Sequence, residues 1–260
     1  MIPNISIIIT TRNSARTLNK CLKSLSQQTY KKIEIIVVDN NSTDNTKKIA
    51  RKYTSKVYNK GPERSAQRNY GVFKAKGNYV LVHDSDIYFH KNSVKECIKL
   101  ADNKNAKAII LPEKSIGSGF WTKVKAFERS FYVGNDLIEA VRFFERKIYL
   151  EVGGYDENLT ACEDWDLTNK IRAKQIKIFR TNSSLLHDEG KLNLFGSSSK
   201  KKYYAKWIKT YKNRYPEISK KQFSFFSRFT FDKLIIKGLC HPILMCSMIL
   251  MKGMEWLNAK

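Results

Sequence analysis

The chain has 260 residues, of which 42% are hydrophobic and 12% aromatic, and this composition excludes a disordered basic tail. Its 48 lysines and arginines against 24 acidic residues give a net charge of +24, which calls for an anionic partner. The length suits one large α/β domain with an appendage better than two equal domains.

The cysteines and the N-terminus both point to a cytosolic protein. Five cysteines, an odd number, show neither a C-x-x-C pair nor the spacing of zinc ligands, so we expect reduced thiols. The apolar run at residues 5–9 is too short for a signal peptide and is followed at once by a polar turn. We therefore expect the first residues to belong to the mature protein.

The first half of the chain alternates between strand and helix patterns. Runs of β-branched residues at 5–9 and 33–38 flank a segment with apolar residues at helical spacing, which predicts a β-α-β unit. The alternation continues through helices at 65–76 and 93–102 and strands at 78–82 and 106–111. Strands that are apolar on both faces and separated by helices predict an α/β fold, with a mostly parallel central sheet flanked by helices.

After residue 111 the pattern loosens. We expect a flexible connection at 117–119, a helix at 163–173, and a pair of strands at 176–179 and 184–187. A serine-lysine stretch at 197–202 predicts a linker into a basic helix at about 200–215. These features predict a catalytic domain over residues 1–195 and a basic, aromatic, helical tail over 196–260.

Three polar clusters, at residues 10–13, 39–44 and 83–86, each directly follow a predicted strand. In parallel sheets, ligands bind at the carboxyl ends of the strands. Asp84 and Asp86 stand one residue apart and can share a hard cation, with a nucleotide diphosphate supplying further oxygen ligands. The alternative is a capped, solvated turn. In the same way, Asp39 is either part of a nucleoside pocket or a cap for the next helix.

Two further groups of residues carry candidate chemistry. Arg64 and Arg68 lie one helical turn apart and can form a fork for phosphates, or they can belong to a solvated helix face. Asp164 lies among three acids at the start of a helix, where it can act as a general base or simply complement the helix dipole. His187, after the last predicted strand, is a third metal ligand or a polar strand end.

In order along residues 5–190, the motifs resemble those of the inverting glycosyltransferases with the GT-A fold, called family 2. The matching pieces are the opening Ile-Ile-Ile-Thr-Thr-Arg-Asn, Cys21-Leu22 with Ser24-Leu25 and Gln28, residues 37–44, Ala66-Gln67-Arg68-Asn69 with Gly71, residues 84–86, residues 152–157, and Glu163-Asp164 with Asp166-Leu167. Each piece is modest, and the ordered set is specific.

The resemblance implies a role for each matching residue. Thr11, Arg12 and Asp39 would frame the base and ribose, and Arg68 would lie near the diphosphate. Asp164 would be the base. The full expected nucleotide-sugar site comprises Thr11, Arg12, Asp39, Arg64, Arg68, Asp84 and Ser85, and the expected metal ligands are Asp84, Asp86 and His187.

The resemblance also implies the reaction. A divalent metal, Mg²⁺ or Mn²⁺, would assist the transfer of one sugar, with inversion, from a UDP- or GDP-linked donor to a hydroxyl or phosphate of the acceptor. Processive members carry Gln-x-x-Arg-Trp after the core; this chain has no such motif, which favours the addition of single sugars. The helix after Asp166 departs from many relatives, which have a glycine at its end.

From residue 200 onward, aromatic residues alternate with lysine, and residues 191–260 carry 15 lysines and arginines against three acids, a net +12. The apolar stretch at 234–251 is interrupted by Lys237 and by His241-Pro242, so we expect helices lying in the membrane interface rather than a clean span. The alternative is a helical pair packed on the catalytic core. Such a tail indicates a lipid-linked acceptor and a peripheral or monotopic protein at the inner face of the cell membrane.

Two other functions compete with this interpretation. The charge and the interleaved lysines and aromatics are also typical of a nucleic-acid-binding protein, although carboxylates at strand ends would repel phosphates unless a metal intervened. We therefore expect no nucleic acid partner. A nucleotidylyltransferase would keep a related fold, but such enzymes generally offer a glycine-rich loop after the first strand, and residues 10–14 contain no glycine.

Overall fold

A computed structural model describes residues 5–194 and 196–257 of the chain, which divides into two compact units. The first consists of Met1–Pro112 with Ala140–Leu186, and the second of Glu113–Glu139 with His187–Lys260. Residues 113–139 therefore group with the C-terminal part of the chain, although the sequence placed them inside a domain ending at 195. The functional division into a catalytic domain and a membrane-associating tail stays a prediction.

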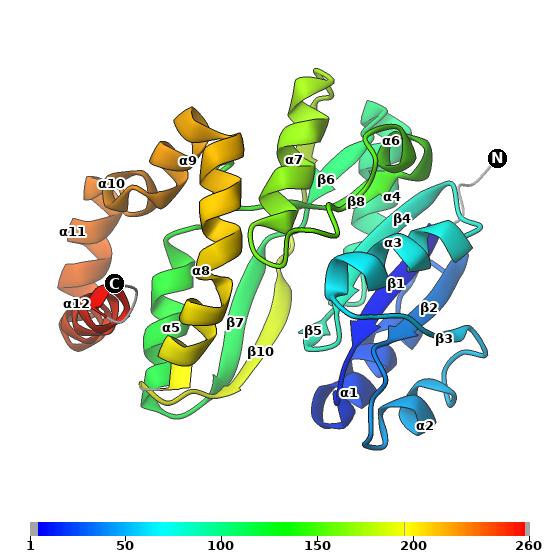
Figure 1. Ribbon diagram of the computed structural model, residues 1–260, viewed down its shortest axis with the longest axis horizontal. Coiled ribbons are helices and arrows are strands. Elements are labelled where there is room, and N and C mark those ends of the chain that lie inside the picture. Colours follow the sequence, from blue (N-terminus) through cyan, green and yellow to red (C-terminus); the bar gives the residue numbers. More distant parts are fainter. Residues whose placement is uncertain (1–4, 195, 258–260) are drawn as a thin grey trace. The chain divides into compact units, whose positions relative to one another are not determined.

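The first unit is built on a seven-stranded sheet with the order β3-β2-β1-β4-β8-β6-β9 (Figure 1). The strands β1 to β4 run parallel to one another, as predicted. The strands are β1 (Ile5–Thr11), β2 (Ile33–Asp39), β3 (Val57–Asn59), β4 (Tyr79–Asp84), β6 (Ala108–Ile110), β8 (Val141–Glu145) and β9 (Ile178–Arg180). The helices are α1 (Ala15–Ser26), α2 (Thr46–Ala50), α3 (Arg64–Lys74), α4 (Ser93–Lys104), α6 (Arg146–Glu151) and α7 (Glu163–Ala173), and a short strand β5 (Ile87–Tyr88) follows β4.

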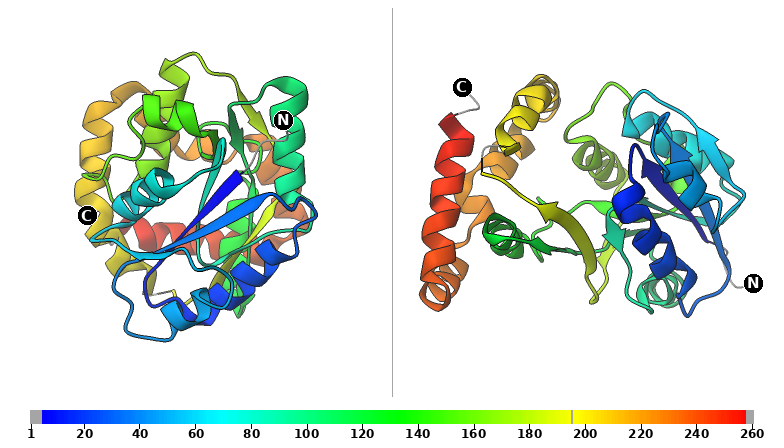
Figure 2. Two further views of the ribbon diagram at one scale, coloured as in Figure 1. Left: turned by 90° about the vertical axis from the view of Figure 1, so that its right-hand side faces the viewer. Right: turned by 90° about the horizontal axis from the view of Figure 1, so that it is seen from below.

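The central strands bury both faces because helices cover both sides of the sheet (Figure 2). Along β1, Ile7 and Ile9 join a core cluster with residues of α1 and α4, while Ile8 joins a second cluster with residues of α3, α6 and α7. This alternation follows from the two-residue period of a strand. The predicted α/β fold with a mostly parallel central sheet is therefore confirmed.

Two expectations about the second half of this unit were wrong. The strand β8 had no counterpart in the sequence prediction, and it runs antiparallel between β4 and β6. The strands predicted at 176–179 and 184–187 do not pair with each other: β9 pairs with β6, whereas β10 (Leu185–Lys191) lies next to β7 (Glu113–Ser118) in another sheet. The backbone bonds Thr181 N to Ile110 O and Leu185 N to Pro112 O guide the chain from one sheet to the other.

In the part of the chain that the structure describes, the second unit contains β7, most of β10, and six helices. These are α5 (Phe120–Ser130), α8 (Gly196–Arg214), α9 (Pro216–Phe223), α10 (Phe225–Arg228), α11 (Phe231–Cys240) and α12 (Pro242–Leu257). The predicted flexible connection at 117–119 instead comprises the last two residues of β7 and the N-cap residue of α5. A side chain on Gly117 would meet the carbonyl oxygen of Gly190 at 2.3 Å. The predicted linker at 197–202 lies within α8, so the helix begins earlier than expected.

Helix α12 packs against α5 within the second unit (Figures 1 and 2). Val124, Phe127 and Phe131 of α5 share a core cluster with Met248 and Met251 of α12. A buried charge joins the same two helices, since the Glu128 carboxylate pairs with Lys252 and, at 2.7 Å, with Lys125. Among the described residues, no helix is both long enough and apolar enough to cross a bilayer.

Candidate active site

The polar clusters predicted at the strand ends meet at one edge of the central sheet. Thr11 of β1 lies opposite Asp39 of β2, and Thr10 of β1 lies opposite Asp84 of β4. The sheet order changes direction here, because β2 and β3 lie on one side of β1 and β4 on the other. Such a switch point is where open α/β sheets bind ligands.

The loops after β1 and β2 are tied together through Asp39. The buried Asp39 carboxylate accepts hydrogen bonds from the Thr11 hydroxyl at 2.8 Å, from the Ser42 amide at 2.8 Å and from the Ser42 hydroxyl at 2.5 Å. Asn13, with a φ of 49°, accepts a bond from the Thr43 amide at 2.9 Å. Arg12 is exposed beside this rigid pair of loops. Asp39 thus caps the turn at Ser42 and not helix α2, which begins at Thr46, and its place in a nucleoside pocket stays a prediction.

Gln67 of α3 links the same two strands, although no role was predicted for it beyond its place in a motif. Its side-chain amide donates to the Thr11 carbonyl at 3.0 Å and to the Val38 carbonyl at 2.7 Å. Both residues are buried, and the Thr11 carbonyl also accepts from the Asn40 amide at 2.8 Å. Helix α3 is thereby fixed over the ends of β1 and β2.

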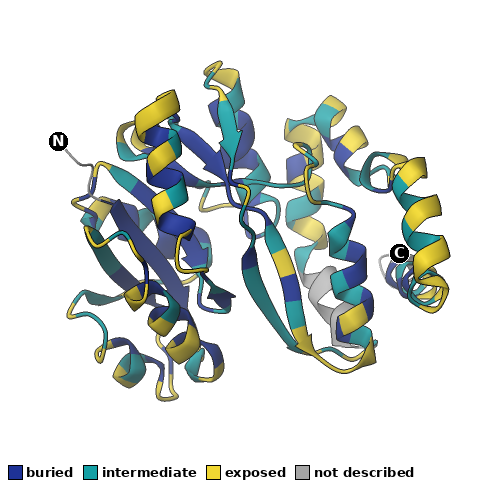
Figure 3. Ribbon diagram, turned by 180° about the vertical axis from the view of Figure 1, so that it is seen from behind, coloured by how far each residue is buried: buried dark blue, intermediate teal, exposed yellow. Residues whose placement is uncertain are grey.

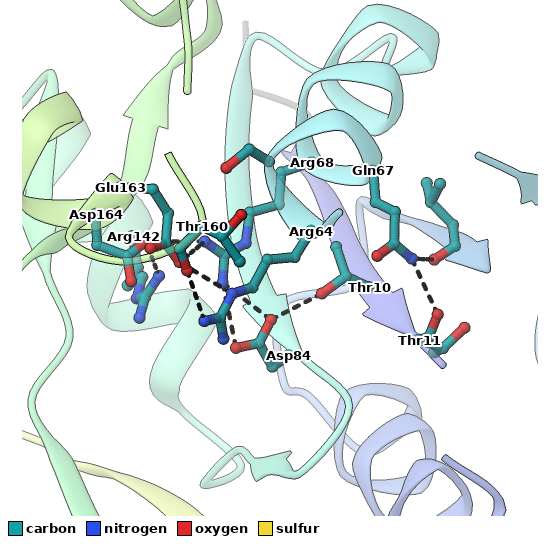
Figure 4. A network of polar contacts seen from close by, with 12 residues as sticks. Thr10, Thr11, Arg64, Gln67, Arg68, Asp84, Arg142, Thr160, Glu163 and Asp164 are labelled. Atoms are coloured by element: carbon teal, nitrogen blue, oxygen red, sulfur yellow. Dashed lines mark hydrogen bonds and ion pairs between the residues drawn. The ribbon is translucent and has the colours of Figure 1, made fainter. Parts of the chain in front are cut away.

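Arg68 of α3 is the centre of the site (Figure 4). Its guanidinium is fully buried and contacts Asp84 Oδ1 at 3.0 Å and Asp164 Oδ1 at 3.0 Å. It also contacts Glu163 Oε1 at 3.2 Å and lies over the ring of Tyr155 at 4.9 Å. Carboxylates from β4 and α7, 80 positions apart in the sequence, therefore meet on one cation.

Two more arginines contact the carboxylates that surround Arg68. Arg64, one turn before Arg68, contacts Glu163 Oε1 at 3.1 Å and the Thr160 carbonyl at 3.1 Å. Arg142 of β8 contacts Asp164 Oδ1 at 2.5 Å. Arg142 was not among the predicted site residues, because no sequence pattern marked β8. Three guanidinium groups thus face the three carboxylates of Asp84, Glu163 and Asp164.

These contacts separate the protonation behaviour of the three acids. Burial alone would raise the pKa of Asp84, but Arg68 above all, then Arg64 and Arg142, hold that pKa well below its usual range. Burial also opposes ionisation of Asp164, and Arg142 and Arg68 outweigh it, so its pKa is lowered. Burial and the neighbouring Asp164 raise the pKa of Glu163. Asp164 is therefore an anion at neutral pH, as a general base must be.

The backbone before α7 determines where the acids point. Cys162 precedes the helix with a φ of 64°, in the left-handed region, and Glu163, Asp164 and Asp166 then fall in the first turn. Acids in the first turn also complement the helix dipole, so that alternative explanation holds alongside the contacts with arginine. Asp166 pairs with Lys170 at 2.8 Å within the helix.

Of the expected metal ligands, Asp84 and Asp86 belong to the first unit and His187 to the second. Asp84 and Asp86 flank the buried Ser85 in the turn between β4 and β5. His187 belongs to the second unit, where its Nδ1 lies 3.0 Å from Glu113 Oε2 and 2.8 Å from an Arg129 nitrogen. Across the described parts of the chain, no three His, Cys, Asp or Glu side chains are gathered as a metal-binding group. The role of His187 as a ligand stays a prediction.

Comparison with known proteins identifies the family. The model of the family described as Glycosyl transferase family 2 matches residues 6–153, more than half of the chain. An uncharacterized glycosyltransferase of Rickettsia typhi is 29% identical over 186 residues, which cover 65% of this chain and 58% of that protein. The poly(ribitol-phosphate) beta-N-acetylglucosaminyltransferase TarS of Staphylococcus aureus is 32% identical over 122 residues, 43% of this chain and 21% of TarS. The chain thus spans less than two thirds of the length of either relative.

Solved structures show the same fold. A crystal structure of S. aureus TarS 1-349 in complex with UDP-GlcNAc has a TM-score of 0.60 at 20% identity and covers 99% of this chain and 82% of that one. The mannosyltransferase PcManGT from Pyrobaculum calidifontis, in complex with GDP-Man and Mn²⁺, has a TM-score of 0.59 at 19% identity and covers 80% of this chain and 62% of that one. The chain therefore belongs to glycosyl transferase family 2 and has the GT-A fold.

Proposed function

We propose that the protein is a metal-dependent, inverting glycosyltransferase that moves one sugar from a nucleotide diphosphate sugar to an acceptor. The observation that carries this proposal is the convergence of Asp84 and Asp164 on the Arg68 guanidinium, at 3.0 Å each. This convergence supports the proposal, because the resemblance to family 2 expects Asp84 beside the nucleotide and Asp164 beside the acceptor. A purely structural ion pair would not require both acids to lie at the ligand-binding edge of the sheet.

The proposed chemistry assigns one proton transfer to Asp164. Its carboxylate removes the proton of the acceptor hydroxyl, the freed oxygen forms a bond to the anomeric carbon, and the bond from that carbon to the diphosphate oxygen breaks. Because attack comes from the face opposite the leaving group, the anomeric configuration inverts. Arg142 and Arg68 hold Asp164 ionised before the acceptor binds.

The two arginines of α3 would act differently on the donor. The side chain of Arg64 is 34% exposed and that of Arg68 is fully buried. Arg64 is therefore the better placed to reach a diphosphate, while Arg68 lies beside it and holds the carboxylates in position. Thr11, Arg12 and Asp39, on the interlocked loops, would frame the base and ribose.

A divalent ion fits the donor chemistry of the turn after β4. Both oxygens of Asp84 already face Arg68, at 3.0 and 3.2 Å, which leaves Asp86 as the stronger candidate ligand. A single carboxylate supplemented by substrate phosphates is the usual way in which proteins hold Mg²⁺. When bound, such an ion would neutralise the charge that develops on the departing nucleoside diphosphate.

The donor and the acceptor follow from the relatives and from the tail. Structures with this fold hold UDP-GlcNAc in one case and GDP-Man in another, which supports a UDP- or GDP-linked donor. The basic C-terminal segment supports a lipid-linked acceptor, attacked through a hydroxyl or phosphate, at the cytoplasmic membrane face.

The proposal is tested by incubating the purified protein with a panel of nucleotide sugars and Mg²⁺ or Mn²⁺ and measuring release of nucleoside diphosphate. With the donor that reacts, Asp164→Asn should lower kcat by about 10²- to 10⁴-fold, the usual contribution of a general base. Asp86→Ala should also abolish turnover and remove the response to added metal. Asp166→Asn, in the same helical turn but paired with Lys170, is the matched control and should keep most of the activity. Equal rates in the Asp164 variant and the wild type would remove Asp164 from the mechanism.

A further inference from the structure

Most large apolar side chains that the described residues leave exposed lie on the three C-terminal helices. Of thirteen such residues, nine fall between residues 225 and 250 (Figure 3). We call them the apolar face: Phe225, Phe226, Phe231, Ile235, Ile236, Leu239, Ile243, Ile249 and Leu250. So many exposed large apolar residues on consecutive helices are unusual on a free protein surface and point to a partner.

Helix α11 differs from an ordinary surface helix in the distribution of its side chains, because its lysines face the protein and most of its apolar residues face outward. Its lysines point inward: Lys233 Nζ donates to the Phe131 and Val133 carbonyls at 3.2 Å each, and Lys237 Nζ donates to the Ser130 carbonyl at 2.9 Å. Helix α5 ends at Ser130, and the last carbonyls of a helix attract cations because they lack partners in the helix. Lys237, which interrupts the apolar stretch in the sequence, therefore lies against the protein.

The opposite side of α11 presents its apolar residues to the outside. Phe231 is 77% exposed, Ile236 63% and Leu239 79%, while Leu234 and Gly238 are half-buried. Helix α12 continues the pattern, since Met248 and Met251 pack on α5 while Ile249 and Leu250 are exposed. Packing against α5 thus leaves the outer faces of both helices mostly apolar, apart from the exposed Asp232 of α11.

Charge decides which partner suits this face. The segment from residue 191 to 260 carries a net +12, and α8 and α9 expose Lys206, Lys209, Lys212, Lys220 and Lys221. Two copies meeting through this unit would bring equal positive charges together, which opposes a homodimer. An anionic bilayer attracts the lysines and accepts apolar side chains at the boundary between headgroups and acyl chains.

We propose that the apolar face of α10, α11 and α12 inserts into the interface of an anionic lipid bilayer, with the lysines of α8 and α9 adding electrostatic attraction. The proposal deepens the membrane association within the proposed function by naming the residues that enter the lipid. Insertion in the plane of the interface needs no helix that spans the membrane, and it uses side chains already exposed in the folded protein.

The test compares sedimentation of the full chain with vesicles of phosphatidylcholine alone and of phosphatidylcholine mixed with phosphatidylglycerol. The wild type should bind the mixed vesicles more tightly, and added salt should weaken the binding. The triple variant Phe231→Ser, Ile236→Ser and Leu239→Ser should lose at least about tenfold in vesicle affinity, since three apolar side chains no longer enter the lipid. Phe73→Ser is the control: Phe73 is 68% exposed but lies on α3, in the first unit, and its loss should leave binding unchanged.

Each other outcome overturns the inference. Undiminished vesicle binding by the triple variant would exclude the apolar face. A wild type that ignores vesicles but dimerises, with the triple variant monomeric, would assign the face to a second copy. Salt-sensitive binding to RNA without binding to vesicles would assign the charge to nucleic acid. The assay reads binding without turnover, so an inactive protein that still binds vesicles would sink only the proposed sugar transfer.

Discussion

Asp164 is subject to two opposed influences, and their balance determines whether it can act as a base. Burial favours its neutral form, whereas Arg142 and Arg68 favour its anion and win, so its pKa is lowered. A base with a lowered pKa is ionised over a wider range of pH but holds a proton less firmly. The two arginines therefore keep Asp164 ionised over a wider range of pH and make it a weaker base.

Arg142 should control the acid side of the pH-rate profile. In Arg142→Gln, burial of Asp164 persists while its largest compensating charge is lost, so its pKa rises toward neutral. The fall of kcat/KM at acid pH should then begin at a higher pH than in the wild type, because only the ionised carboxylate accepts the proton. The profile is measured with the donor that gives turnover.

Arg142→Lys is the matched control for this prediction, because it retains the positive charge although it changes the geometry. It should keep the acid limb near that of the wild type even if kcat falls. An acid limb that stays in place in Arg142→Gln would show that Arg142 serves structure alone.

The site residues that could be predicted from the sequence lie next to a recognisable sequence pattern. Two of them, Asp39 and Asp84, lie at the ends of recognisable strands, and Asp164 lies at the start of a recognisable helix. All three belong to the motifs that resemble family 2. Arg142 lies in a five-residue strand that runs antiparallel to β4, and no turn or periodic pattern marked it. Its partner Asp164 is 22 positions away, so only the folded chain reveals the pair.

At the scale of elements, the site depends on how closely α3 approaches the sheet. Helix α3 carries Gln67 and Arg68 and crosses β1 at Gly71, where an added Cβ would lie 2.4 Å from Ile8 Cγ2 and 3.2 Å from Val38 Cγ2. Both contacts belong to buried strands that cannot move without disturbing the core. The close packing of α3 on β1 and β2 therefore explains why position 71 is a glycine.

Gly71→Ala should destabilise the protein by about 1–3 kcal/mol through overpacking, more than the roughly 1 kcal/mol that alanine gains over glycine in a helix. The measurement is the thermal unfolding midpoint. Gly253→Ala in α12 provides the comparison, since nothing lies within 4 Å of its added Cβ, and it should leave the midpoint unchanged or raise it. A midpoint in Gly71→Ala equal to that of the wild type would mean that α3 shifts outward freely.

The elements themselves were predictable where strands and helices alternate regularly along the chain. Strands β1, β2 and β4 and helices α1, α3 and α4 appear close to their predicted ranges because each is a regular α/β repeat. After residue 111 the chain leaves the sheet, returns antiparallel as β8 and leaves again. Local periodicity carries no information about such returns. The strands with which β9 and β10 pair could therefore not be predicted.

At the scale of the molecule, the second unit is assembled from two distant segments. Residues 113–139 supply α5, and residues 187–260 supply the helices that cover it. Val124 is fully buried and Phe127 and Phe131 nearly so, and each owes this to the cluster that includes Phe229, Met248 and Met251. The C-terminal helices are therefore part of a folded core as well as a candidate membrane surface. Packing on the protein and binding to a membrane are thus compatible for this segment.

A protein cut to residues 1–195, the predicted catalytic domain, should consequently be less stable than the full chain. It retains α5 without its cover, and each newly exposed apolar side chain costs roughly 1.5–3 kcal/mol. The buried Glu128 carboxylate also loses Lys252, which leaves it with less compensating charge. We expect aggregation, strong binding of a hydrophobic dye and a lower unfolding midpoint.

The cause can be separated from a general failure to fold by a second protein, residues 1–195 with Phe127→Ser and Phe131→Ser. These changes remove the apolar surface that the missing helices cover, so this version should regain solubility and bind less dye. If the unmodified 1–195 protein were already monomeric, dye-free and as stable as the full chain, α5 would not need the C-terminal helices. The tail would then be a separate attachment, as the sequence alone suggested, and the boundary at 195 would be the structural one.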